Sequence, residues 1–506
     1  MNETSSASVV PHPSEAAAEV TRPWAWLAVG VAMSLLASGG RWNVALAAWI
    51  APILLLRFYR SGKAGIAIAA IIAISCVQIA WWNLETGVPP SPSSGALTIA
   101  IGLLYAIPFV LDRVTGPSLG PWGRIALLPA AMAATEFAVG AVLPVGTSVG
   151  MRAITQSENL ALLQIISLTG PYVIALLIGC AATIANHIWE ARTPQALLRK
   201  GGLFAATLLV ILAAGQSRLT FGANIGAPTV KIAGITPPMA LRDAANGLVS
   251  MSSFPPSADA LAATRTPAAR AANAAILDTL LEDSRKAAKA GAQIVIWSET
   301  AAPVIAEDKP ALLRRAAALA REERIYINVA VGVAFERNET FLIAPDGTIQ
   351  WHYRKNHPVP GMEPVSPFAN APPLVHTPFG TLSNIICFDA DFPALARIDA
   401  DILIVPAWDW PEIAIAHTMH MARLRAIENG YSLVRVDYNG TSAVFDPMGR
   451  IVARQDTTTG GAHMMMADVQ VSGTATLYGR VGDLFAWLCV LFSGVLVAFA
   501  RRRYRV

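Results

Sequence analysis

The chain has 506 residues, of which 54% are hydrophobic and only 14% are charged. Soluble globular proteins carry about 25% charged residues, so the composition excludes an ordinary soluble protein. The net charge of +4 is too small to indicate nucleic-acid binding.

The apolar residues concentrate before residue 216 and after residue 482. A bilayer core of about 30 Å requires about 20 helical residues, and eight apolar segments approach or exceed that length. We therefore predict seven transmembrane helices and, after a long polar interval, an eighth. The segments are 24–39, 42–56, 64–82, 96–111, 125–143, 160–188, 201–215 and 483–500.

Basic residues follow the second, fourth, sixth and eighth segments, among them Arg57, Arg113, Lys200 and Arg501. Cytoplasmic loops carry the excess of Lys and Arg, so the pattern predicts a cytoplasmic N-terminus, with Arg152 as its exception. Five regions follow from this topology. They are a cytoplasmic tail (1–22), a seven-helix membrane domain (23–216), an external domain (217–482), the eighth helix (483–500) and a basic cytoplasmic tail (501–506).

The external region alternates apolar strands with amphipathic helices, which is typical of a layered α/β domain. Predicted strands include "VKIAGI", "AQIVIW", "IYINVAVGVAF", "LSNIIC", "DILIVP" and "YSLVRV". Predicted helices are 273–291, 309–324 and 417–430, and two hairpins cover 341–353 and 442–452. The stretch 236–272 is rich in Ala, Ser and Pro and is predicted to be an arm lying over the domain.

Three reactive side chains stand where predicted strands end: Glu299 in "IVIWSETAAP", Lys355 in "HYRKNHPVPGMEP" and Cys387 in "IICFDADFP". Active sites of α/β folds lie at such strand ends. A thiolate attacks carbonyl carbon, and Glu299 is placed in the role of general base. Lys355 would lower the pKa of the thiol and, with the backbone N–H of Phe388, stabilise an oxyanion. The product would be a covalent thioester.

Taken singly, these residues have simpler explanations. A lone cysteine at a strand end is often a buried core thiol, and Glu299 with Lys355 would serve equally as a plain ion pair. A catalytically silent membrane scaffold therefore remains an alternative, which the presence of all three residues opposes. His417 and His420 lack the further ligands that a metal site needs, so we predict neither a metal nor a cofactor.

The Glu, Lys and Cys contexts, in this order, resemble the carbon–nitrogen hydrolase (nitrilase) superfamily. With the predicted membrane spans, the chain resembles the apolipoprotein N-acyltransferase family in particular. The resemblance implies an αββα sandwich in the periplasm of the bacterial inner membrane, with Glu299 as base, Lys355 as the family lysine and Cys387 as nucleophile. It implies acyl transfer from a phospholipid to the N-terminal amine of a diacylglyceryl-cysteine lipoprotein, and Glu363 would help hold Lys355.

The sequence departs from that family at several positions. Phe388-Asp389 stands where Tyr-Glu is usual, so the hydrogen bonds of a shorter carboxylate must be rebuilt. Trp408 and Trp410 flank Asp409 in a changed loop, where they would line a substrate cleft or pack in the core. These departures leave open a second function, a membrane-anchored amidase or nitrilase-like hydrolase that uses the same Glu-Lys-Cys triad on an external amide.

Overall fold

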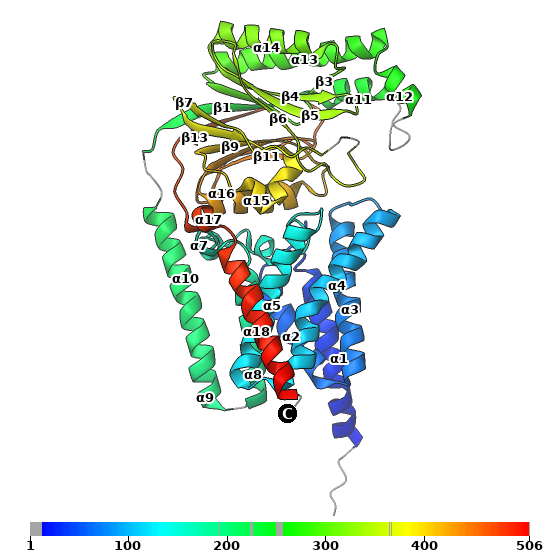
Figure 1. Ribbon diagram of the computed structural model, residues 1–506, viewed down its shortest axis with the longest axis vertical. Helices are drawn as coiled ribbons and strands as arrows, with labels where there is room; N and C mark the ends of the chain where they lie inside the picture. Colours follow the sequence, from blue (N-terminus) through cyan, green and yellow to red (C-terminus); the bar gives the residue numbers. More distant parts are fainter. Residues whose placement is uncertain are drawn as a thin grey trace, which may run out of the picture.

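The computed structural model describes residues 13–504 except 192, 223–225, 249–256, 364 and 366, with side chains described between residues 23 and 502. Residues 1–12 of the predicted N-terminal tail, Arg192 and the last two residues of the basic tail therefore lie outside the described residues. The molecule has two parts, a bundle of long helices and an α/β domain stacked on one end of it (Figure 1).

Each predicted apolar segment contains a helix. Among the described residues, six helices are long and apolar enough to cross a membrane: α3, α4, α5, α8, α10 and α18. The apolar part of α1 and the whole of α2 are shorter. The bounds are α1 (Pro13–Leu35), α2 (Ala47–Ser61), α3 (Ala64–Glu85), α4 (Pro92–Thr115), α5 (Pro121–Val142), α8 (Val173–Ala191), α9 (Pro194–Ala196), α10 (Gly202–Phe221) and α18 (Leu484–Tyr504).

The predicted span 160–188 is interrupted. It begins with two single-turn helices, α6 (Leu160–Leu163) and α7 (Ile166–Thr169), and only then continues as α8. Gly170 takes the left-handed φ of 77° and is followed by Pro171, which cannot donate a backbone hydrogen bond. This pair ends α7 and redirects the chain.

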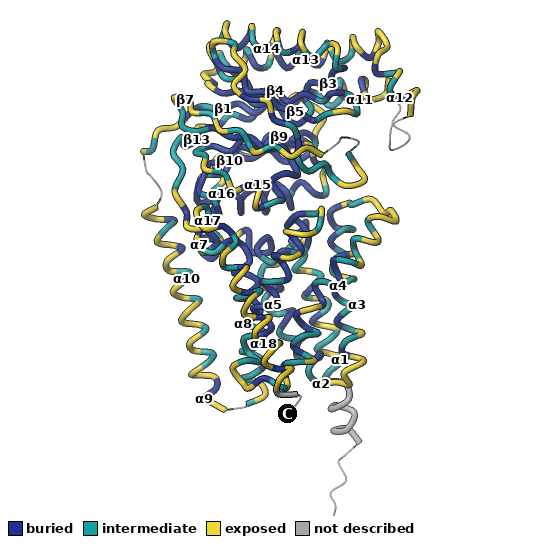
Figure 2. The backbone as a smooth tube through the Cα atoms, viewed as in Figure 1, coloured by how far each residue is buried: buried dark blue, intermediate teal, exposed yellow. Residues whose placement is uncertain are grey.

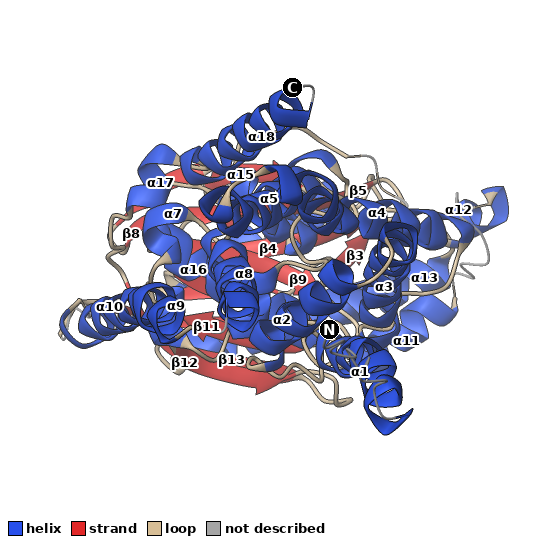
Figure 3. Ribbon diagram, turned by 90° about the horizontal axis from the view of Figure 1, so that it is seen from below, coloured by secondary structure: helices blue, strands red, loops and turns tan. Residues whose placement is uncertain are grey.

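The helices differ in how far the protein buries them. In the most apolar stretch of α5, 67% of the residues are buried, whereas none are buried in the most apolar stretch of the helix that includes α10. Figure 2 shows α10 with mainly exposed residues along its length, and Figure 3 shows it at the rim of the bundle. An apolar helix that other helices do not cover is typical of a lipid-facing position.

Arg152, the exception to the charge pattern, is paired within the protein. It opens the 3-10 turn η2 (Arg152–Gln156), and its guanidinium lies 2.7 Å from the carboxylate of Glu136 on α5. Glu136 is also a buried charge, and buried charges are normally paired. The pairing neutralises Arg152 and explains its departure from the loop-charge pattern.

The α/β domain contains two mixed sheets, and the predicted fold class is confirmed. The first sheet has the order β13 (His463–Gln470), β1 (Thr229–Thr236), β2 (Ile294–Trp297), β4 (Tyr326–Val333), β5 (Arg337–Ile343), β6 (Ile349–Arg354), with β3 (Ala302–Val304) paired to β4. The second has the order β12 (Ile451–Asp456), β11 (Thr441–Phe445), β10 (Ser432–Tyr438), β9 (Ile402–Trp408), β8 (Gly380–Asn384), β7 (Leu374–Thr377). Both predicted hairpins are present, as β5–β6 and β11–β12.

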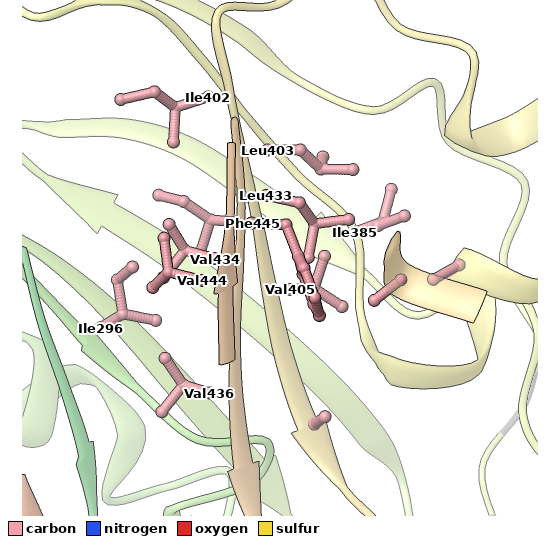
Figure 4. Close-up of a cluster of buried hydrophobic side chains, with 14 of the residues drawn as sticks. Ile296, Ile385, Ile402, Leu403, Val405, Leu433, Val434, Val436, Val444 and Phe445 are labelled. Carbon is pink, nitrogen blue, oxygen red and sulfur yellow. The ribbon is translucent and has the colours of Figure 1, made fainter. Parts of the chain in front are cut away.

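The two sheets pack face to face and share one apolar core. In Figure 4, Val434 and Val436 of β10 point toward Ile296 of β2, while Leu433 and Val405 point to the opposite face. Both faces of the second sheet are therefore buried, which explains why its central strands are continuous apolar runs rather than alternating ones. Gly234 of β1 allows the close approach, because a Cβ there would lie 2.7 Å from Val436.

Helices cover both outer faces and complete the αββα sandwich (Figure 1). The first sheet is covered by α13 (Pro267–Lys289) and α14 (Lys309–Glu323), and the predicted arm contains α11 (Met239–Gly247) and α12 (Ala258–Ala263). The second sheet is covered by α15 (Pro393–Ala396), the π-helical segment η5 (Ile415–Ala422) and α16 (Arg423–Asn429), with α17 (Leu477–Val481) nearby. Met421, Leu424 and Ile427 belong to the apolar core of the membrane bundle, so the helices that cover the second sheet pack directly into that bundle.

Candidate active site

The three predicted strand-end residues converge in the structure. Glu299 follows β2, Lys355 follows β6 and Cys387 follows β8. The ammonium of Lys355 donates a hydrogen bond of 2.8 Å to Glu299 Oε1, and the side chains of these two residues are at most 3% exposed. Lys355 and Glu299 both act electrostatically on the Cys387 thiol. A thiol, an ammonium and a carboxylate thus share one buried site.

Glu299 is held in place from several sides. Its Oε1 also accepts a hydrogen bond of 2.5 Å from the amide of Asn338, and its backbone N–H donates to the carbonyl of Ala407 at 3.3 Å. Thr300, the next residue, has a φ of 48°, a left-handed conformation that non-glycine residues adopt only when the surroundings enforce it. The turn therefore presents the carboxylate in a fixed direction.

Lys355 is bracketed by two carboxylates, because Glu363 accepts a second hydrogen bond from its ammonium. Burial alone would lower the pKa of Lys355, but Glu299 and Glu363 outweigh it and the pKa lies well above the usual range. Burial raises the pKa of Glu363 to about 7, against the pull of Lys355. Lys355 is therefore a permanent cation, whereas Glu363 changes charge near neutral pH.

The raised pKa of Glu363 predicts a pH-dependent stability. A carboxyl whose folded pKa is about 7, above its ordinary 4.5, binds its proton more tightly in the folded protein than in the unfolded chain. Its contribution to stability is complete below the ordinary pKa and is lost as the pH rises from there to about 7. We expect the Tm of the wild type in detergent, relative to Glu363→Gln, to fall by about 3 °C or more between pH 5 and pH 8. A difference that stays constant with pH, as expected for the exposed control Glu307→Gln, would contradict this.

Cys387 opens the 3-10 turn η4 (Cys387–Asp391) with a φ of 47°. Burial and Glu299 raise the pKa of its thiol well above the usual range, and Lys355 with Arg435 opposes them only in part. Lys355 therefore lowers the thiol pKa, as predicted, but burial and Glu299 raise that pKa by more. A thiol that is neutral at rest requires a base during attack, which is the role predicted for Glu299.

Sequence reasoning missed a second charged group behind the thiol. Arg435 of β10 is 1% exposed, and its guanidinium lies 3.9 Å from Cys387 Sγ and 2.8 Å from Asp409 Oδ2. Asp409 Oδ1 in turn lies 2.9 Å from His417 Nδ1, whose other nitrogen lies 3.3 Å from Asp391. The only signal was an arginine inside the apolar strand "YSLVRV". Among the described residues, no group of three metal-ligating side chains is arranged to hold a metal ion.

Asp389 ties the nucleophile turn to the segment that carries Lys355. Its carboxylate accepts hydrogen bonds from the Tyr353 hydroxyl at 2.8 Å and from the backbone N–H groups of His357 and Ile386 at 2.8 and 3.1 Å. Although Asp389 is shorter than the usual glutamate, its carboxylate still forms hydrogen bonds to both segments. Its neighbour Phe388 is buried and packs edge-to-face on Phe392 at 5.4 Å.

The membrane bundle contributes to the same turn. The backbone N–H and the hydroxyl of Thr147, in the loop after α5, both donate to the carbonyl of Asp391 at 2.8 Å. Trp410 donates from its indole to the carbonyl of Thr86 at 2.6 Å, at the end of α3. Trp410 is therefore part of the contact with the membrane helices, whereas Trp408 is 39% exposed and remains a candidate for the substrate cleft.

Comparison with known proteins finds one family and several relatives. The carbon–nitrogen hydrolase family model matches residues 261–478. Apolipoprotein N-acyltransferase of Geobacter metallireducens is 29% identical over 388 residues, 69% of this chain and 69% of that protein. The protein of the same name from Gloeobacter violaceus is 32% identical over 41% of this chain and 45% of its own length. A solved amidase from Nesterenkonia sp. is 18% identical, with a TM-score of 0.38, and covers 50% of this chain and 94% of its own. The matched family region contains Glu299, Lys355 and Cys387.

Proposed function

We propose, from the premise that this chain is a homologue of the apolipoprotein N-acyltransferases with a carbon–nitrogen hydrolase domain, that it matures lipoproteins. It takes a fatty acyl chain from a phospholipid onto Cys387 and passes it to the N-terminal amine of a diacylglyceryl-cysteine lipoprotein. The observation that carries the proposal is the convergence of Lys355 and Glu299 on the buried thiol of Cys387.

The first half-reaction forms the thioester. Cys387 Sγ attacks the ester carbonyl of the phospholipid while Glu299 takes the thiol proton, which matches a thiol that is neutral at rest. The negative charge on the carbonyl oxygen is stabilised by Lys355 and the backbone N–H of Phe388. When the C–O bond breaks, Glu299 returns the proton to the leaving oxygen, and a lysophospholipid departs as the alcohol.

The second half-reaction transfers the acyl chain. The neutral α-amine of the acceptor attacks the thioester carbonyl, and the same cation and N–H stabilise the oxyanion. Glu299 removes the proton from the attacking nitrogen and returns it to the departing Cys387 sulfur. An amide forms, the thioester breaks, and the free thiol is restored.

The membrane helices support this choice over a hydrolase. Both substrates of the proposed reaction are anchored in lipid, and a catalytic domain whose helices pack into the membrane bundle would meet them at the bilayer surface. The proposed arrangement places 217–482 in the periplasm and the basic ends of the helices in the cytoplasm. The shorter Asp389 was one reason to consider an amidase. Its hydrogen bonds to Tyr353 and His357 weaken that reason.

One experiment tests the function. Purified protein in detergent is incubated with a phospholipid labelled in its acyl chain, and the Cys387 peptide is examined for an adduct that hydroxylamine removes. A diacylated lipopeptide is then added. We expect the adduct to form and its label to move to the lipopeptide amine. An adduct from a small amide but none from phospholipid would favour the hydrolase, and no adduct from either would refute both enzymatic functions.

A further inference from the structure

Arg242, on α11, is a buried arginine that the mechanism above does not use. It is 4% exposed. Its Nη1 donates to the carbonyl of Thr300 at 2.5 Å and its Nη2 to the Thr300 hydroxyl at 3.3 Å, while its Nε has no hydrogen-bond partner. Among the ion pairs of the described residues none involves Arg242.

Two aromatic rings face this guanidinium. Its central carbon lies 4.7 Å from the ring centre of Trp408 and 5.3 Å from that of Tyr438. Such rings offset part of the cost of burying a cation, but a buried charge is ordinarily matched by a carboxylate as well. Burial accordingly lowers the pKa of Arg242. Glu299 and Asp243 offset this effect only in part, and Nε remains a buried donor without a partner, a combination that suits Arg242 to bind a further anion.

Arg242 lies near the catalytic carboxylate that we propose. Thr300, which it holds, directly follows Glu299, and Arg242 is close enough to Glu299 for the two charges to interact. Trp408 ends β9 and precedes Asp409 and Trp410, and the latter contacts the end of α3. Trp408 is 39% exposed, so one of the two rings that contact the guanidinium also reaches solvent. Arg242 is therefore linked through Trp408 to the segment that contacts the membrane helices, and through Thr300 to the carboxylate of Glu299.

We propose that Arg242, framed by Trp408 and Tyr438, is an anion subsite that receives the phosphodiester of the acyl donor. This inference rests on the proposed function, because it names the part of a phospholipid that the site recognises. Arginine is suited to the task, since its planar fork of N–H donors matches phosphate oxygens. Movement of the Trp408 ring would open the free face of the guanidinium to the headgroup.

The test compares two acyl donors on the same protein. Formation of the Cys387 adduct is followed by intact mass in a single turnover, once with phospholipid in mixed micelles and once with a p-nitrophenyl fatty ester, which has no phosphate. For Arg242→Gln we expect the rate with phospholipid to fall about tenfold or more at low donor concentration, as for a lost hydrogen bond to a charged group. The rate with the p-nitrophenyl ester should fall much less, because that loss reports only the hydrogen bonds from Arg242 to Thr300. Arg242→Lys should recover much of the phospholipid rate, and Arg314→Gln, at an exposed position on α14, is the matched control.

The outcomes separate the possible roles. Equal losses with both donors, not recovered by lysine, would mean that Arg242 only holds the Thr300 turn, and would overturn the anion subsite. Unchanged rates with both donors would also overturn it. If the wild type reacts with the p-nitrophenyl ester but never with phospholipid, the proposed function itself fails, a result distinct from failure at Arg242 alone.

Inorganic phosphate distinguishes the source of the anion. A subsite for a lipid-borne phosphodiester predicts that added inorganic phosphate leaves the wild-type rate with phospholipid unchanged, because the lipid is held chiefly by its apolar chains. Suppression of the wild-type rate by phosphate, absent in Arg242→Gln, would assign the subsite to free phosphate and overturn the assignment to the lipid.

Discussion

Replacement of Cys387 by alanine is expected to abolish the acyl adduct and to reduce acyl transfer to the uncatalysed background, a loss of about a thousandfold or more. No other group of the site can form the thioester, because Glu299 and Lys355 only move charge and protons around the attacking atom. The measurement is the intact mass of the protein after incubation with labelled phospholipid, together with the rate of lipopeptide acylation. Cys489→Ala, which removes another buried thiol on α18, should leave both unchanged. Full turnover by Cys387→Ala would show that the nucleophile is assigned wrongly.

The left-handed φ of 47° at Cys387 gives this prediction a second part. A side chain in that conformation costs about 1–2 kcal/mol, whereas glycine adopts it freely. We therefore expect Cys387→Gly to be as inactive as Cys387→Ala but to unfold at a higher temperature, by about 2 °C or more. A lower Tm for glycine than for alanine would mean that the turn is not strained.

Replacement of Lys355 by methionine is expected to stop thioester formation and to destabilise the fold. Methionine fills a similar volume but leaves the carboxylates of Glu299 and Glu363 facing each other without their shared cation. Removing one partner of a buried ion pair costs about 3–5 kcal/mol, and loss of an oxyanion donor costs about a hundred- to a thousandfold in rate. Thermal unfolding in detergent and adduct formation from phospholipid measure the two effects.

Lys309→Met is the matched control for Lys355. Lys309 forms a 2.8 Å ion pair with Glu339, a carboxylate that is fully buried in the same domain. Glu339 keeps Arg337 and His352 as further partners, so this variant should lose less stability and should form the adduct at the wild-type rate. If Lys309→Met slowed the adduct as much as Lys355→Met, the loss would reflect general destabilisation rather than the position of the ammonium.

The triad could be proposed from the sequence because each member follows a recognisable strand and the three motifs resemble the carbon–nitrogen hydrolase superfamily. Strand "IVIW" is followed by Glu299, and the hairpin strand "WHYR" ends at Lys355. Glu299 and Lys355 follow β2 and β6 of the first sheet, whereas Cys387 follows β8 of the second. Their proximity therefore depends on how the two sheets pack, and at the level of the sequence only the family resemblance of the three motifs implies it. The alternation of buried strands with amphipathic helices predicted a layered α/β domain, and the family resemblance implied the αββα order of its layers.

Other features depend on contacts that no local pattern reveals. Arg435 lies in an apolar strand, and only the folded structure shows that its charge meets Asp409 and the thiol. Strand β13 was not predicted, because "HMMMADVQ" has weak alternation and is fixed by its pairing with β1, more than two hundred residues earlier in the chain. Arg242 lay in a stretch predicted as an arm, where nothing marks the residue that turns inward.

The two hydrogen bonds from Thr147 to the Asp391 carbonyl link folding of the nucleophile turn to folding of the membrane helices. The turn that carries the sulfur atom is completed by a loop whose own position depends on helices inserted in lipid. A newly synthesised chain would thus acquire its nucleophilic geometry only after insertion, and a catalytic domain cut free of its helices would lose it. The proposed acyl transfer would then be confined to the bilayer surface, where both of its proposed substrates are anchored.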